Sequence, residues 1–99
     1  MALSKDQSTR NTDFDCGYGI VCDDKGNIIE NLIVTGANQE HGLITTKDGS
    51  NFDFDAYPIG TRLRILPNHS CMTAAAHDHY NVVDGDSEII ETWQRCNGW

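Results

Sequence analysis

Short runs of apolar and β-branched residues alternate along this chain with turns rich in glycine, asparagine and aspartate. Runs of this kind, bounded by turn residues, are typical of strands. Only residues 72–76 have helix-favouring composition, enough for one or two turns. The pattern predicts an all-β fold, a small antiparallel β-barrel or sandwich of roughly five to seven short strands with at most one short helix. The runs that predict strands cover residues 19–22, 28–35, 40–46, 51–55, 61–66, 80–83 and 88–93.

Alternation within these runs predicts which side chains face the core. Leu63 and Ile65 should point inward and the arginines beside them outward. Residues 51–55 alternate aromatic and acidic side chains, which predicts an edge or connecting strand with one wet face. Asp84-Gly85 is a hairpin signal that should pair the last two runs. The tryptophans are expected to be structural, Trp93 in the core and Trp99 as an end cap or an oligomer contact.

The length of the chain fits one domain, residues 1–99, preceded by a polar lead-in. The lead-in, residues 1–15, lacks periodicity and is expected either to dock on the domain or to remain mobile. Lys and Arg number 7 against 15 Asp and Glu, a net charge of −8. This charge repels phosphate backbones and anionic lipids, and no apolar run approaches membrane-spanning length. Nucleic acids and membranes are therefore not expected partners.

Four cysteines would allow two disulfides in three pairings. No leader with a basic region followed by an apolar region begins the sequence, so we expect a cytoplasmic protein with reduced thiols. Cys16, Cys22 and Cys96 are most simply explained as small hydrophobes or bystanders. Cys71 differs from them because a histidine precedes it by two residues.

His69 and Cys71 form the strongest candidate site. They follow a predicted strand and would face the same side if the backbone stays extended there. An imidazole and a thiolate suit Zn²⁺ best among common metal ions. Because two ligands hold zinc weakly and catalytic zinc usually has three protein ligands, a third is expected. Candidates for it are His41, His77, His79, a nearby carboxylate or another component.

Other interpretations of this region compete with the metal site. The spacing also fits a buried histidine hydrogen-bonded to backbone beside a buried thiol. Ser70 does not pair with His69 as nucleophile and base, because neighbours on an extended chain point to opposite faces. Gly17-Tyr18-Gly19 has no helix after it, so it predicts a tight turn and not a phosphate-binding loop.

Several motifs taken together are more specific than any one of them. Their order and spacing resemble those of the C-terminal domain of the D-serine dehydratase and D-threonine aldolase family over essentially the whole chain. The motifs are Ala2-Leu3-Ser4-Lys5-Asp6, Gly17-Tyr18-Gly19, Gln39-Glu40-His41-Gly42, Pro67-Asn68-His69-Ser70-Cys71, Asp78-His79-Tyr80, Thr92-Trp93 and Gly98-Trp99.

The resemblance implies an alanine-racemase-like enzyme in which an N-terminal barrel carries pyridoxal phosphate and this β-domain completes the active site. It implies that His69 and Cys71 hold zinc, and the cysteine places the chain nearer the dehydratase branch than the aldolase branch, which has an aspartate there. It also implies structural roles for His77 and His79.

The cofactor barrel of that family has no counterpart in this sequence. None of the three lysines occupies a family-like position for binding the cofactor, and without that electron sink the chain is not expected to bind pyridoxal phosphate or to be catalytic alone. The leading hypothesis is a stand-alone zinc-binding β-domain that complements a separate barrel subunit and contacts a small amino-acid-like ligand. The alternative is a non-catalytic self-assembly module, a homo-oligomer with a vestigial metal site.

Overall fold

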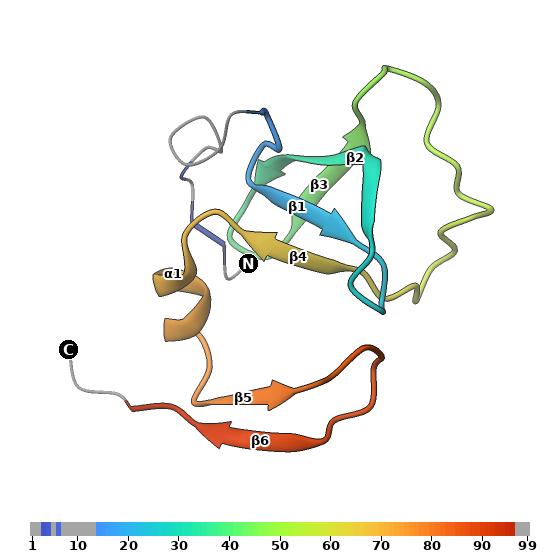
Figure 1. Cartoon of the computed structure of the whole chain (residues 1–99). Helices are drawn as coiled ribbons and strands as arrows, with labels where there is room; N and C mark the ends of the chain where they lie inside the picture. The colour runs from blue at the N-terminus through green and yellow to red at the C-terminus, as the bar shows by residue number, and fades with distance from the viewer. Residues whose placement is uncertain (1–2, 5, 7–13, 97–99) are drawn as a thin grey trace.

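The computed structural model describes residues 3–4, 6 and 14–96. Within them the chain forms two antiparallel sheets and one short helix (Figure 1). The first sheet has the strand order β3-β2-β1-β4, and β5 and β6 pair as a separate hairpin. The all-β prediction with one short helix is therefore confirmed. The elements are β1 (Gly19–Cys22), β2 (Ile28–Ala37), β3 (Gly42–Thr46), β4 (Arg64–Pro67), α1 (Ser70–Ala75), β5 (His79–Val82) and β6 (Glu91–Gln94).

Asp23 shapes the turn that joins β1 to β2. Its Oδ1 accepts hydrogen bonds from the backbone amides of Lys25 and Asn27, both at 2.9 Å, and its Oδ2 accepts one from Asn27 Nδ2 at 2.9 Å. These donors favour the ionised carboxylate, and they lower the pKa of Asp23 below its usual 3.8. The side chain of Asp23 therefore stabilises the turn of the β1–β2 hairpin.

The core lies on the four-stranded sheet. Val21, Leu32 and Val34 are buried there. Leu63 and Ile65 pack against this group, as the alternation in residues 61–66 predicts. The other partly buried side chains around it are Tyr18, Ile29, Ile44, Phe52 and Tyr57.

Two features of the predicted architecture are wrong. No closed barrel forms among the described residues, because β3 and β4 are the two unpaired edges of the sheet. Residues 51–55 form no strand, because the chain enters a turn at residues 54–56. Asp53 Oδ1 accepts hydrogen bonds from the backbone amides of Asp55 (3.0 Å) and Ala56 (3.1 Å). Local hydrogen bonding by the aspartate competes there with strand pairing. The alternation still brings Phe52 and Phe54 together, with ring centroids 5.0 Å apart.

The β5–β6 hairpin forms as predicted, but it does not complete a core. Tyr80 pairs with Trp93 across it, and the loop between the strands is longer than a two-residue turn. Trp93 is 55% exposed, so its predicted place in the core is wrong. The hairpin lies beside the four-stranded sheet and not face to face on it (Figure 1). This arrangement leaves every residue of β6 open to solvent.

The ends of the chain are described only in part. Leu3 and Ser4 are buried at 8% exposure each, so the part of the lead-in that is described docks on the domain. The rest of the predicted lead-in up to residue 13 and the predicted end cap Trp99 lie outside the described residues. Among the described residues, no helix is long and apolar enough to cross a membrane.

Candidate metal centre

The predicted pair lies where β4 gives way to α1. His69 keeps an extended backbone (φ −140°, ψ 115°) as the N-cap of α1, and the helix begins at Ser70. Cys71 therefore belongs to the first turn of a helix, and the premise of an extended backbone through Cys71 is wrong. Both residues are exposed, so the alternative of a buried histidine beside a buried thiol does not describe them.

His69 has a carboxylate partner from the other end of the sequence. Its Nδ1 lies 2.6 Å from Asp6 Oδ2, and the His69 and Asp6 side chains are 48% and 34% exposed. An ionised carboxylate can only accept a hydrogen bond, so Nδ1 carries the proton. In the neutral ring, Nε2 then holds the lone pair and is the nitrogen that a metal can use.

Asn68 fixes the backbone on both sides of this contact. Its Nδ2 donates to the carbonyl oxygens of Asp6 (2.9 Å) and Gly17 (2.8 Å), and its Oδ1 accepts from Cys16 Sγ at 3.5 Å. Ser4 Oγ accepts a hydrogen bond from the Asp6 amide at 3.3 Å. The residue before His69 therefore binds the same short segment that carries Asp6.

Gly17 allows this close packing. Its φ is +61°, and a Cβ built on it would lie 2.0 Å from the carbonyl oxygen of Val34. The Gly19 amide donates to the Cys16 carbonyl at 3.2 Å, which closes a turn over residues 16–19. The predicted tight turn is confirmed, and it presents the Gly17 carbonyl to Asn68.

The predicted third ligands are not gathered at this pair. Among the described residues, no group of three or more His, Cys, Asp and Glu side chains could hold a metal ion. His41 Nε2 lies 3.4 Å from Asn38 Nδ2 in the β2–β3 turn, and His79 Nδ1 lies 2.7 Å from Asp78 Oδ1 at the start of β5. The Asp78–His79 hydrogen bond lowers the pKa of Asp78. Among the described residues, none of the predicted third ligands therefore joins His69 and Cys71 in a group that could hold a metal ion.

All four cysteines are free thiols in the described part of the chain. Cys16 and Cys22 are buried, as predicted for small hydrophobes, whereas Cys71 and Cys96 are exposed. Burial, followed by the neighbouring Asp23 carboxylate, raises the pKa of Cys22. Its protonated thiol is a poor ligand and nucleophile, which leaves Cys71 as the exposed sulfur beside a histidine.

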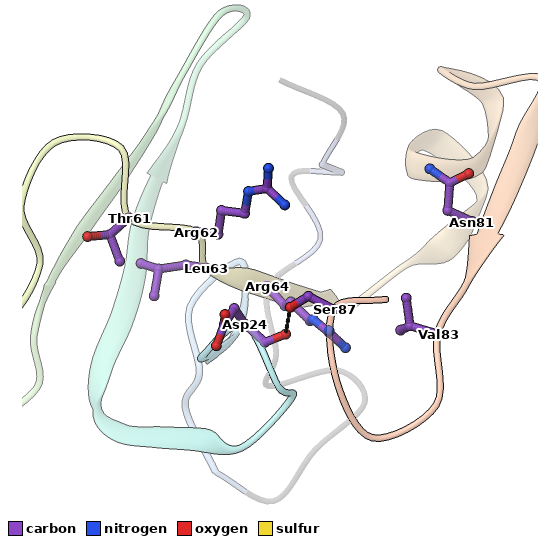
Figure 2. Close-up of a pocket in the computed structure, with 8 residues that line it drawn as sticks. All are labelled: Asp24, Thr61, Arg62, Leu63, Arg64, Asn81, Val83 and Ser87. Carbon is purple, nitrogen blue, oxygen red and sulfur yellow. Dashed lines mark hydrogen bonds between the residues drawn. The ribbon is translucent and has the colours of Figure 1, made fainter. Parts of the chain in front are cut away.

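A cleft of about 560 Å³ separates the chain entering β4 from the β5–β6 hairpin (Figure 2). Arg62 and Arg64 line one wall, and Asn81 and Ser87 come from the hairpin. Two hydrogen bonds join the sides: Arg64 Nη2 donates to the carbonyl of Asp86 at 2.6 Å, and Ser87 Oγ donates to that of Asp24 at 2.9 Å. The cleft opens at the start of β4, whereas His69 follows the end of that strand.

Asp6 is the residue that sequence reasoning missed. It lies in a polar, aperiodic segment and is 63 positions from His69, so no local pattern connects the two. The Ala2-to-Asp6 motif was a signal that this segment mattered, but it gave no role to any residue in it.

Comparison with known proteins gives a consistent result. A family model described as "Putative serine dehydratase domain" matches residues 1–83. D-threo-3-hydroxyaspartate dehydratase from a Delftia species is 45% identical over 101 residues, which cover 100% of this chain and 26% of that enzyme. D-serine dehydratase from Dictyostelium discoideum is 38% identical over 82 residues, which cover 83% of this chain and 20% of that enzyme.

Solved structures show the same fold. A metal-free cysteine-to-alanine variant and a histidine-to-alanine variant of D-threo-3-hydroxyaspartate dehydratase each match with a TM-score of 0.81 at 42% identity. The matches cover 99% of this chain and 26% and 25% of those chains. The chain spans only 26% and 20% of the length of the two curated relatives described above.

Proposed function

The chain belongs to the D-serine dehydratase family, and from that premise we propose that it is a zinc-binding β-domain whose metal donors are His69 Nε2 and the Cys71 thiolate. The observation that carries the proposal is the contact between His69 and Asp6, because metal-bound histidines almost always donate their second ring N–H to a carboxylate or carbonyl. Both donors are exposed: His69 is the N-cap of α1, and Cys71 lies in the first turn of that helix.

The donor set fits zinc by its chemistry. Imidazole nitrogen and thiolate sulfur are the ligands that zinc prefers, at about 2.0 to 2.1 Å and 2.3 Å. The two described donors leave coordination positions for a substrate, for water or for a ligand from another part of the protein. The variants of the Delftia relative support the choice, because the histidine and cysteine replaced in them are two positions apart, the spacing of His69 and Cys71.

The proposed domain works together with a pyridoxal-phosphate barrel, in the same or another polypeptide, on a small amino-acid-like substrate. When bound, zinc supplies Lewis acidity to a hydroxyl leaving group. The described residues bind and orient: His69 and Cys71 supply the donors, and Asn68 holds the turn through Asp6 and Gly17. No residue of this chain is proposed to catalyse the reaction without the barrel.

The test is the zinc content of protein purified without chelator. We expect more zinc per chain in the wild type than in the His69→Ala/Cys71→Ala variant, which should hold close to none because both donors are lost. The matched control is His41→Ala/Cys96→Ala, which removes an exposed histidine and an exposed thiol elsewhere and should keep the zinc. Equal zinc in the His69/Cys71 variant and the wild type would exclude this site.

A second candidate function, self-assembly, rests on the β5–β6 hairpin. Tyr80 and Trp93 are cross-strand neighbours and therefore share one face, at 43% and 55% exposure. Ile89 and Ile90, just before β6, are also more than half exposed. We propose that this hairpin face pairs two copies of the chain when no barrel covers it.

Light scattering over a concentration series tests this second candidate. The wild type should gain mass with concentration, and Trp93→Ala should weaken the association. A chain that stays monomeric throughout would rule self-assembly out. The zinc assay is unaffected by this outcome, because the metal donors lie outside the hairpin.

A further inference from the structure

We infer that Asp6 is the positioning residue of the metal centre: it holds the proton on His69 Nδ1 and so presents Nε2 to the metal. This inference rests on the proposed zinc site and deepens it. The geometry behind it is the 2.6 Å approach of Asp6 Oδ2 to His69 Nδ1, which is short enough for a charge-assisted hydrogen bond.

A histidine on an exposed turn has two ring nitrogens and several rotamers, and only some combinations serve a metal shared with Cys71. The Asp6 carboxylate removes one of these choices, since an acceptor at Nδ1 excludes the tautomer in which that nitrogen holds the lone pair. It also fixes the ring plane. Such outer carboxylates raise the basicity of the ligand nitrogen and reduce the freedom lost on binding.

The position of Asp6 is itself fixed. Asn68 Nδ2 holds the Asp6 carbonyl at 2.9 Å, and the Asp6 amide donates to Ser4 Oγ at 3.3 Å. Leu3 and Ser4 are buried beside it. Because Asn68 directly precedes His69, the carboxylate and the imidazole are anchored to the same backbone. The short N-terminal segment thus acts as part of the metal centre.

The first measurement is the zinc dissociation constant, by competition with a chelator, for the wild type, Asp6→Ala and Asp55→Ala. Losing an orienting carboxylate typically weakens metal binding by about 10- to 100-fold, and we expect a loss in that range for Asp6→Ala. Asp55→Ala removes the same charge from an exposed turn and should bind zinc as the wild type does. An unchanged affinity in Asp6→Ala would overturn the inference.

The second measurement needs no metal, and it separates this inference from the proposed function. Nitrogen-15 NMR of the metal-free protein at mildly alkaline pH should show His69 protonated at Nδ1 in the wild type. In Asp6→Ala, the Nε2-protonated form that free imidazole side chains favour should appear. His69 protonated at Nε2 in the wild type, or the same tautomer in both proteins, would overturn the inference. Loss of zinc binding with the expected tautomers would contradict only the zinc proposal.

Discussion

The four-stranded sheet and the β5–β6 hairpin both carry large apolar side chains, but they differ in how far these side chains are buried. In the sheet, Val21 and Val34 are 1% and 0% exposed, because β1 and β2 lie between two other strands under the side chains from residues 52–65. In the hairpin, Trp93 is 55% exposed and β6 has no buried residue. The sheet supplies its own core, whereas the hairpin leaves its large apolar side chains exposed.

The proposed metal donors lie between these two regions. His69 and Cys71 follow the sheet's edge strand β4 and precede the hairpin. Asn68, which directly precedes His69, donates a hydrogen bond to the carbonyl oxygen of Gly17 and so ties this segment to the sheet. The proposed donor pair therefore lies in the segment that joins the buried sheet to the exposed hairpin.

The largest expected effect comes from a pair of glycines, one in each region. Gly17 (φ +61°) and Gly85 (φ +77°) both have a left-handed backbone conformation. A Cβ on Gly17 would lie 2.0 Å from the Val34 carbonyl oxygen, whereas a Cβ on Gly85 would have no atom within 4 Å. Gly85→Ala should cost about 1 kcal/mol of unfolding free energy for backbone strain alone. Gly17→Ala should cost more than about 3 kcal/mol, because the backbone must also move.

Urea denaturation followed by circular dichroism measures both variants. Equal losses would mean that the Gly17 turn is not packed against β2 as described. The two glycines have similar positive φ values and differ only in how closely other atoms surround them. Equal losses would therefore mean that the sheet is no more tightly packed around Gly17 than the hairpin is around Gly85.

A pair of apolar truncations tests burial directly. Val34→Ala removes two methyl groups at 0% exposure and should cost about 2 to 3 kcal/mol of unfolding free energy, including the cavity. Trp93→Ala removes a much larger side chain, yet in the monomer at low protein concentration it should cost less than about 1 kcal/mol, because that side chain is half-exposed. Urea denaturation followed by circular dichroism shows which of the two variants loses more unfolding free energy.

If the hairpin is uncovered, Trp93→Ala must lower the unfolding free energy less than Val34→Ala does, although tryptophan is the larger side chain. A Trp93→Ala loss above that of Val34→Ala would show that the hairpin packs on the sheet. The sandwich expected from sequence would then describe the molecule better than two separate sheets.

The smallest expected effect is on the pH dependence of the β1–β2 turn. Hydrogen bonds from Asn27 and neighbouring amides hold the pKa of Asp23 below 3.8, so the unfolded state binds the proton more readily. The carboxylate therefore stabilises the fold above pH 3.8, and this stabilisation is lost as the pH falls through the lower, folded pKa. Asp23→Asn should lose less stability on acidification than the wild type does.

Unfolding midpoints in urea at several acidic pH values measure this difference. Asp55→Asn serves as the control, because it replaces an exposed aspartate in the loop between β3 and β4. Parallel pH profiles for Asp23→Asn and the wild type would contradict the role given to the turn.

Local patterns were sufficient for much of the fold. Runs of apolar and β-branched residues predicted all six observed strands within a few residues of their bounds, and Asp84-Gly85 predicted which two strands pair at the end. The strand predicted at residues 51–55 is wrong because Asp53 accepts hydrogen bonds from the amides that follow it, and alternation does not reveal this option. The core position predicted for Trp93 is wrong because the prediction assumed that every strand belongs to one common core.

The sequence by itself determined that an imidazole and a thiol, His69 and Cys71, lie two residues apart after a strand, because this depends only on neighbouring residues. Tertiary structure alone decided that Cys71 starts a helix, that Asp6 meets His69 from 63 positions away, and that the hairpin stays uncovered. The physical reason is that orientation and burial depend on contacts between distant segments. The contact between Asp6 and His69, for example, depends on Asn68, whose side chain donates hydrogen bonds to the carbonyl oxygens of Asp6 and Gly17 at the end of β4.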